Sequence, residues 1–440
     1  MNRLIHSFRK CGRLIFLFLL ILNWTGSSYA QRPNIIYIMA DDLGYADLSC
    51  YGRKDYSTPN LDKLSTQGMK FISAYSAAPL CTPTRVGFMT GRYPARFPVG
   101  LREPLVMNAK DSMIGLSPEY YSLPLLLQNA GYETALIGKW HLGFKPEYSP
   151  NKNGFDYFFG FNSGGLDYIS HGGEKDGSDL YENEKAIAVD GYLTDIFEQK
   201  VIDFLQKPHR KPFFLSVQFN APHWPWQGPD DKAYPDTLRL NAGGSPETFA
   251  IMMKELDDAV GTIINELEKQ NATNTVVIFT SDNGGEKFSD MGNLTGMKFL
   301  LWEGGIKVPA FIRWPGKIKP GITEQPIITM DWTATIASIA GAQPKYPFDG
   351  KDLTPLLMAQ QTNNDRTFYW RVHQRNRQKA IRDGNWKWLQ DEKGEYLFDL
   401  SVDPGEKNNL REKQPAKFET LKKKFELWEA TMLKPIPLGG

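Results

Sequence analysis

Apolar runs that stop at polar residues, glycine or proline divide the chain into alternating strands and helices. Three such runs open the segments 34–44 ("NIIYIMADDLG"), 211–226 ("KPFFLSVQFNAPHWPW") and 274–285 ("NTVVIFTSDNGG"). Continuous β-branched and aromatic runs of this length are typical of buried strands. Each run ends in a polar turn, so the pattern predicts three strands with chemically capable side chains at their carboxyl ends.

Helical patterns lie between these strands. Residues 250–270 have apolar positions at helical spacing, and residues 122–143 predict a helix, a stop at Gly131 and a short strand over 133–137. Strands that are apolar throughout and alternate with helices indicate a parallel sheet covered on both faces. We therefore predict an α/β fold with a large mixed, mostly parallel sheet flanked by helices.

The pattern changes beyond about residue 365. The stretches "TFYWRVH", "QKAIRDGNWKWLQ" and "GEYLFDL" alternate apolar and polar residues and are separated by turns, and residues 416–432 have a helical pattern. The sequence thus predicts a small C-terminal antiparallel α+β subdomain over residues 366–440, behind a larger domain over residues 31–365.

The first thirty residues have the pattern of a secretory signal peptide. A basic beginning precedes the apolar run 14–22 ("LIFLFLLIL"), and small residues end the segment at Ala30. The run is shorter than the roughly 20 residues of a spanning helix, so an anchoring helix is the weaker alternative. We expect residues 1–30 to be removed, no membrane span after cleavage, and export to a periplasm or to the medium.

The net charge and the cysteine content exclude two further classes of protein. The net charge of +1 argues against a surface that binds nucleic acid. Once the signal peptide is removed, only Cys50 and Cys81 remain, fewer than a chain held together by disulfides would carry. A single Cys50–Cys81 bridge is one alternative, but Cys81 lies in "PLCTPTR", between prolines and close to Arg85, and this setting favours a functional role.

Adjacent carboxylates at strand ends predict a metal site. Asp41 and Asp42 follow one predicted strand, and Asp282 and Asn283 follow another. Ligands of α/β sheets bind outside the carboxyl ends of strands, and paired buried carboxylates require neutralisation. Oxygen donors without cysteine or histidine suit Ca²⁺ first and Mg²⁺ second. For "DDLG" alone, a solvated turn would be the better interpretation; the second cluster favours the metal.

Five cationic or protonatable residues complete the candidate site. They are Arg85, Lys139, His141, His223 and Lys298. If they converge near the metal, they can hold a tetrahedral oxyanion and protonate a leaving oxygen. Phosphate and sulfate esters are the substrates that this chemistry fits.

Two long motifs carry a resemblance to a known family. The chain resembles the formylglycine-dependent (type I) sulfatases of the alkaline phosphatase superfamily. One signature is met by "CTPTR" with "TGR" behind it, and the other by "GYETALIGKWH"; "DDLG", "SDNG", "EGGIKVP" and "LFDLSVDPGEKNNL" follow the family's order. Thr84 stands where many members have serine. The resemblance implies an alkaline-phosphatase-like fold and the hydrolysis of sulfate esters by S–O cleavage.

The resemblance also implies a cofactor and a modified residue. Cys81 is expected to be oxidised to formylglycine by a maturation enzyme, and its hydrate to be the nucleophile. Ca²⁺ is expected to be held by an oxygen of modified Cys81 and by the predicted acidic cluster, Asp41, Asp42, Asp282 and Asn283.

The same resemblance assigns roles to the cations. Arg85 is expected to orient the hydrate, and Lys139 and Lys298 to balance the charge of the sulfate oxygens. His223 is favoured as proton donor to the departing alcohol, a role that Lys298 could share. His141 is expected to take a proton from the second hydroxyl as sulfate leaves.

The sugar-binding residues are predicted on weaker grounds. Asp167 and His171 lie in a glycine-rich segment, Trp224 and Trp226 flank the His223 loop, and Arg371, His373 and Arg375 lie in the C-terminal subdomain. They suggest exo-acting removal of sulfate from a glycosaminoglycan or algal polysaccharide fragment.

Four alternatives stay open. They are an arylsulfatase of broad specificity, a formylglycine-dependent phosphonate or phosphodiester hydrolase, a non-catalytic glycan-binding protein, and a metal-dependent hydrolase in which Cys81 stays a thiol.

Overall fold

The computed structural model describes residues 32–108, 111–172, 179–234, 243–359, 361, 366–374 and 376–436. The predicted signal peptide lies outside these ranges and stays a prediction. Contacts group Pro33–Gly440 into one unit, and the predicted division at residue 365 likewise stays a prediction. Among the described helices, none is both long enough and apolar enough to cross a membrane.

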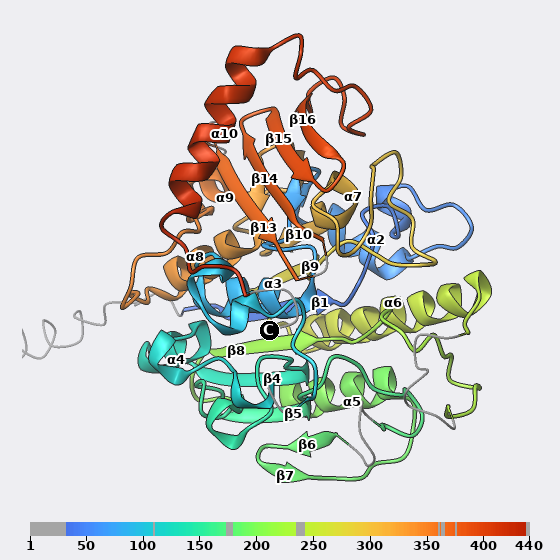
Figure 1. The fold of residues 1–440 in the computed structure, drawn as a ribbon. Coiled ribbons are helices and arrows are strands. Elements are labelled where there is room, and N and C mark those ends of the chain that lie inside the picture. The colour runs from blue at the N-terminus through green and yellow to red at the C-terminus, as the bar shows by residue number, and fades with distance from the viewer. Residues whose placement is uncertain are drawn as a thin grey trace, which may run out of the picture. The chain divides into compact units, whose positions relative to one another are not determined.

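A large mixed sheet organises the described chain (Figure 1). Its strands in spatial order are β11 (Gly321–Thr323), β2 (Met69–Phe71), β10 (Ala310–Arg313), β9 (Thr275–Ser281), β1 (Asn34–Ala40), β8 (Phe213–Gln218), β4 (Glu133–Lys139), β5 (Tyr157–Phe161), β6 (Leu180–Glu182) and β7 (Lys185–Ala186). The five central strands, from β9 to β5, are parallel neighbours, while β10, β6 and β7 pair antiparallel. This confirms the predicted mixed, mostly parallel sheet.

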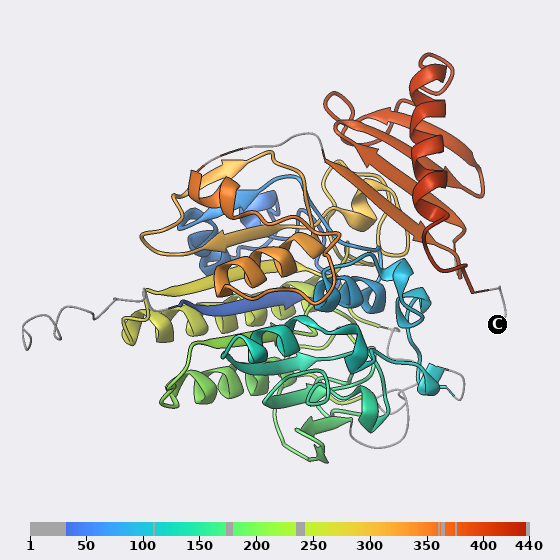
Figure 2. The same ribbon diagram turned by 90° about the vertical axis from the view of Figure 1, so that its left-hand side faces the viewer.

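Alternate residues of the central strands enter two separate cores. In β1, Ile35, Tyr37 and Met39 belong to one apolar cluster, whereas Ile36 and Ile38 belong to the other. Successive side chains of a strand point to opposite faces, so a strand without polar positions needs cover on both. Figure 2 shows helices on either side of the sheet.

Most helices form two layers, one on each face of the large sheet, and the short helical turns lie in the connecting loops. Those packed in the Tyr37 core are α3 (Cys81–Thr90), α4 (Leu123–Asn129), α8 (Thr329–Ala340) and α9 (Thr354–Ala359); those packed in the Ile36 core are α2 (Pro59–Thr66), α5 (Leu193–Gln206) and α6 (Pro246–Lys269). A short helix, α7 (Glu303–Ile306), precedes β10. Single 3₁₀ turns span Ser49–Tyr51, Pro94–Arg96, Val99–Leu101, Asp111–Met113, Pro118–Tyr120 and Pro146–Tyr148.

The C-terminal part forms an antiparallel sheet of its own, orange to red in Figure 1. Its strands are β13 (Thr367–Val372), β14 (Gln378–Asp383), β15 (Trp386–Asp391) and β16 (Gly394–Asp399), followed by α10 (Pro415–Glu429). Ile381, Trp388 and Leu397 of this sheet pack against Leu421 and Phe425 of α10. The expected C-terminal antiparallel α+β element is therefore present. A further two-stranded sheet pairs β12 (Ile327–Ile328) with β3 (Ala74–Tyr75).

Candidate active site

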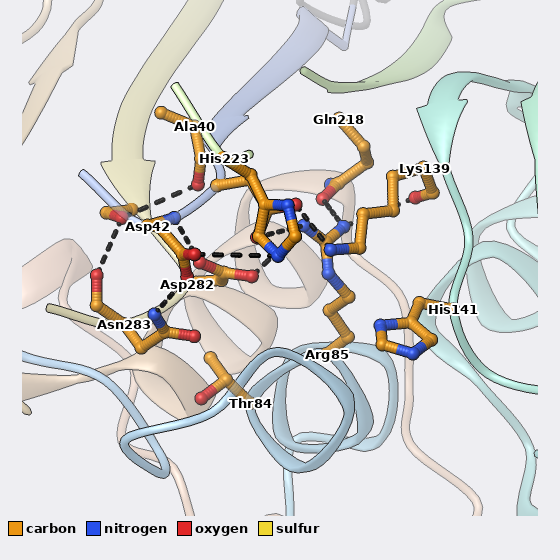
Figure 3. A network of polar contacts seen from close by, with 12 residues as sticks. Ala40, Asp42, Thr84, Arg85, Lys139, His141, Gln218, His223, Asp282 and Asn283 are labelled. Atoms are coloured by element: carbon orange, nitrogen blue, oxygen red, sulfur yellow. Dashed lines mark hydrogen bonds and ion pairs between the residues drawn. The ribbon is translucent and has the colours of Figure 1, made fainter. Parts of the chain in front are cut away.

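The two predicted acidic clusters meet at one edge of the sheet. Asp41 and Asp42 follow β1, and Asp282 and Asn283 follow β9, which pairs parallel with β1. The backbone N–H of Asp42 donates to Oδ1 of Asp282 over 3.1 Å, and Nδ2 of Asn283 donates to Oδ1 of Asp42 over 2.7 Å (Figure 3). Parallel register thus brings together residues about 240 positions apart.

Burial sets the charge balance of this cluster. Asp41, Asp42 and Asp282 are essentially inaccessible to solvent. Burial raises the pKa of Asp42 and raises that of Asp282 well above its usual range, and the negative charge of Asp41 adds to both effects. For Asp41 burial acts in the same direction, but Lys139 and the other nearby positive charges outweigh it and hold its pKa below the usual range. Buried carboxylates in this number need positive charge close by to stay ionised.

The donor set fits a hard divalent cation. Oδ1 of Asp41 and Oδ1 of Asn283 are buried, and neither accepts a hydrogen bond from the described residues. Possible ligand atoms of Asp41, Asp42 and His223 lie within 4.8 Å of one another. Asp282 is partly engaged, because its Oδ2 accepts from Arg85 over 3.1 Å. Carboxylate and amide oxygens in this number suit Ca²⁺ or Mg²⁺.

Arg85 links three strand ends from the first turns of α3. Its guanidinium donates to Oε1 of Gln218 over 2.9 Å, to the carbonyl oxygen of Lys139 over 3.2 Å and to Asp282. Figure 3 shows it between the acidic cluster and Lys139. Gln218 is a site residue that the sequence analysis missed, although its place as the last residue of β8 is the signal that identified the others.

Cys81 is the first residue of α3 and is 2% exposed. Burial raises the pKa of its thiol, against the lowering effect of Lys139 and Lys298. Within the described chain both Cys81 and Cys50 are free. The alternative of a Cys50–Cys81 bridge is therefore not realised.

Two buried lysines approach the acidic pair from different elements. Nζ of Lys139 forms an ion pair with Oδ2 of Asp41, and Nζ of Lys298 lies 2.6 Å from Oδ2 of Asp42 and 3.5 Å from Oε1 of Glu286. Burial lowers the pKa of Lys298, but Asp42 and Glu286 outweigh that effect and raise it. Lys298 therefore carries a positive charge in the resting site.

The two histidines predicted to be catalytic differ in their hydrogen bonds. Nδ1 of His223 lies 2.6 Å from the carbonyl oxygen of Trp224, which only accepts, so Nδ1 bears the proton, and Nε2 lies 3.5 Å from Oδ2 of Asp42. Burial, followed by the charge of Lys298, lowers the pKa of His223 well below its usual value. Nε2 of His141 lies 2.9 Å from the carbonyl oxygen of Leu105 and bears a proton by the same reasoning.

A cavity of about 330 Å³ is lined by four of these residues, Cys81, His141, His223 and Lys298, whereas Arg85, Lys139 and the acidic cluster are not among its lining residues. Its lining residues are Cys81, Pro104, Leu105, Val106, His141, Gly164, His223, Trp224, Trp226, Glu286, Lys298 and Phe299. The segment 104–106, Glu286 and Phe299 were not predicted. Nothing in their local pattern marks them, because their role depends on how distant loops fold together. A larger cavity of about 580 Å³, lined by Asp349 and Arg366 among others, contains none of the predicted site residues.

Of the residues predicted to contact the sugar, some line the cavity and others hold the surrounding loops in place. Trp224 and Trp226 line the cavity. The Asp167 carboxylate accepts from the backbone N–H groups of Ile169, Ser170 and Tyr234 and from Nε2 of Gln227, and so holds the surrounding loops in place.

Three other predicted contacts have structural partners. His171 is buried, with Nε2 3.0 Å from the carbonyl oxygen of Gly191. Arg371 donates to the carbonyl oxygen of Leu433, and the backbone N–H of His373 donates to Glu103. These residues are not among those that line the cavity, and Arg375 lies outside the described residues. Their sugar contacts stay predictions.

Comparison with known families identifies the fold and the chemistry. Residues 33–342 match the family model described as sulfatase. The chain belongs to the sulfatase family. Residues 297–431 of this sulfatase also match the model described as N-sulphoglucosamine sulphohydrolase, C-terminal. As a family member with named sulfatase relatives, it is a sulfuric ester hydrolase.

Three relatives illustrate how far the likeness extends. The chain is 33% identical over 382 residues to N-acetylgalactosamine-6-sulfatase of Canis lupus familiaris, covering 80% of this chain and 72% of that protein. It is 31% identical over 395 residues to arylsulfatase G of Rattus norvegicus, covering 78% and 72%. The crystal structure of Ps i-CgsB in complex with k-i-k-neocarrahexaose superposes with a TM-score of 0.81 at 31% identity, covering 93% of this chain and 95% of that one.

Proposed function

We propose that this sulfatase removes sulfate from a sulfated saccharide by S–O cleavage, with Cys81 oxidised to formylglycine and Ca²⁺ bound beside it. The observation that supports the proposal most directly is the position of Cys81, which lines one cavity together with Lys298, His141 and His223. Relatives named for N-acetylgalactosamine-6-sulfate and solved with a neocarrahexaose support a saccharide substrate. The modest volume of the cavity favours a terminal sugar and hence exo action.

The acidic cluster is the proposed Ca²⁺ site. Asp41, Asp42, Asp282 and Asn283 supply the oxygen donors, and one buried oxygen each of Asp41 and Asn283 accepts no hydrogen bond from the described residues. Bound there, Ca²⁺ would supply Lewis-acid activation of an oxygen nucleophile, which the hydrated aldehyde of formylglycine provides.

The remaining groups act on the sulfate and on protons. Lys139 and Lys298 compensate the charge of the sulfate oxygens. Arg85 holds the end of β8 and Asp282 in fixed positions relative to Cys81 through its hydrogen bonds. His223 delivers a proton to the departing sugar oxygen, and His141 accepts a proton from the modified side chain when sulfate is expelled.

The test compares the intact protein with two cysteine variants. Purified protein incubated with a panel of sulfated mono- and disaccharides is expected to release inorganic sulfate, measured by ion chromatography. Cys81→Ala should lower this rate by at least about a thousandfold, because the nucleophile is lost. Cys50→Ala, a change at the other free cysteine, should keep the rate.

Two further readouts decide between the open alternatives. The mass of the Cys81 peptide should show replacement of the thiol by an aldehyde. An unmodified thiol in active protein would contradict the proposal, as would a strong preference for an aryl phosphodiester over an aryl sulfate.

A further inference from the structure

The carboxylate of Glu286 lies in the wall of the cavity that Cys81 and Lys298 also line. The residue lies in the loop that follows β9, and its side chain is 20% exposed. Its Oε1 is 3.5 Å from Nζ of Lys298, and none of the described residues donates a hydrogen bond to this carboxylate. It is therefore an acceptor that a ligand in the cavity can use.

Glu286 lies close to both candidate proton donors. The backbone N–H of Lys298 donates to the carbonyl oxygen of Gly285 over 3.0 Å, which holds Lys298 beside the Glu286 loop. The negative charge of Glu286 also acts on His223. The ester oxygen leaves beside its proton donor, so a carboxylate in this part of the cavity wall can reach the sugar that carries that oxygen.

The rest of the sugar side is apolar. Trp224, Trp226 and Phe299 provide aromatic faces, and Pro104 and Val106 continue the wall. Aromatic faces suit the apolar face of a pyranose ring. Among the described lining residues, the side chains that can be positively charged are Lys298, His141 and His223, all three assigned above to steps of the hydrolysis. None is left there to pair with a second anion on the sugar.

We propose that Glu286 is a specificity-determining residue that selects a neutral sugar. Its carboxylate accepts a hydrogen bond from a hydroxyl group next to the sulfate ester, and it repels a uronate carboxylate or a second sulfate at that position. This inference rests on the proposed sulfatase site and adds the substrate class, a monosulfated hexose or N-acetylhexosamine.

Electrostatic interactions with Glu286 determine how much more tightly a neutral sugar sulfate should bind than a doubly anionic one. A hydroxyl that donates to a carboxylate forms a charge-assisted bond, stronger than a neutral one. Two like charges about 4 Å apart at a partly exposed site repel each other enough to change affinity on the order of tenfold or more. Both effects favour the neutral sugar.

The test measures inhibition of para-nitrophenyl sulfate hydrolysis by sugar sulfates, which gives a constant for every sugar whether or not it is cleaved. Galactose-6-sulfate and N-acetylgalactosamine-6-sulfate represent neutral rings, and a hexuronate-2-sulfate and a disulfated glucosamine represent doubly anionic ones. The neutral sugars are expected to bind at least about tenfold more tightly. Glu286→Gln keeps an acceptor but removes the charge, and should reduce this ratio severalfold. Glu247→Gln removes one exposed charge outside the cavity lining and should preserve the ratio.

The outcomes separate the two proposals. If para-nitrophenyl sulfate is not hydrolysed by correctly matured protein, the sulfatase proposal fails. If it is hydrolysed but the doubly anionic sugars bind as tightly as the neutral ones, or if Glu286→Gln leaves the ratio unchanged, the sulfatase proposal stands and the role of Glu286 is wrong. If it is hydrolysed but no sugar sulfate binds, the saccharide substrate and the role of Glu286 are both wrong.

Discussion

At the scale of single residues, the site contains two candidates for protonating the leaving group, and their resting states differ. Lys298 is positively charged, held 2.6 Å from Asp42. His223 is neutral, with its proton on Nδ1 and directed at the carbonyl oxygen of Trp224. A bound sulfate anion adds negative charge beside His223, which favours the protonated ring. The proposed proton donor is thus one that the substrate itself helps to charge.

The role of His223 can be tested by comparing how its substitution affects substrates with poor and with good leaving groups. A proton donor matters most when the departing alcohol is a poor leaving group, so His223→Gln should slow hydrolysis of a sugar sulfate about a hundredfold. Hydrolysis of the activated para-nitrophenyl sulfate should fall much less. His209→Gln changes a histidine that contacts Glu133 outside the cavity and should leave both rates intact. Equal losses on the two substrates would remove His223 from the role.

At the scale of elements, the strands predicted from the sequence are those that hold the site. The apolar runs 34–40 and 275–281 correspond to β1 and β9, and Asp42 and Asn283 meet because these two strands pair in parallel. The sequence pattern gives strand ends but not which loops close over them. Glu286 and the segment 104–106 reach the cavity only through tertiary folding, so no spacing rule could identify them.

The close approach of β4 and β8 depends on one glycine. Gly138 has φ +115°, and a Cβ there would lie 2.0 Å from the carbonyl oxygen of Gln218. Gly138→Ala should therefore separate the strand ends that carry Lys139 and Gln218, lower the free energy of unfolding by about 2–4 kcal/mol and reduce activity.

A matched glycine isolates the effect of the clash. Gly341 also has positive φ, +67°, but a Cβ there would meet nothing within 4 Å. Gly341→Ala should lower the free energy of unfolding by only about 1 kcal/mol and keep activity. Urea unfolding of both variants measures the difference, and similar losses would contradict the steric explanation.

At the scale of the whole molecule, a buried ionic cluster connects the C-terminal sheet to the short helix α7. Lys387 of β15 lies 2.9 Å from Oε1 of Glu303 and 2.7 Å from Oε1 of Glu406. Burial raises the pKa of Glu406 to about 7, against the lowering effect of Lys387. Burial acts on Glu303 in the same direction, but Lys387, Lys307 and Arg382 together outweigh it and lower its pKa. Lys387 is thus shared between two buried carboxylates, and Glu406 is the one whose pKa is raised.

This cluster should make stability fall as pH rises. The folded pKa of Glu406 is raised above its ordinary value of 4.5, so its stabilising effect is complete below about pH 4.5 and is lost as pH rises through 7. The shift of roughly 2–3 pKa units corresponds to about 3 kcal/mol. The lowered pKa of Glu303 affects the free energy of unfolding only below about pH 4.5, where its stabilising contribution is lost as the pH falls.

Glu406→Gln should therefore reduce the decline in free energy of unfolding between pH 5 and pH 8 by about 3 kcal/mol. Urea unfolding at both values gives the slope, with exposed Glu412→Gln as control. The same slope in wild type and Glu406→Gln would exclude this cluster as its source.

The burial of Cys81 has a consequence for how active protein is made. A side chain only 2% exposed, at the start of a helix packed in the core, is closed to any enzyme once the fold is complete. If oxidation of Cys81 creates the nucleophile, the oxidation must take place before the chain has folded. A molecule that folds first stays inert for its lifetime, so specific activity would depend on the history of each molecule's synthesis as well as on its sequence.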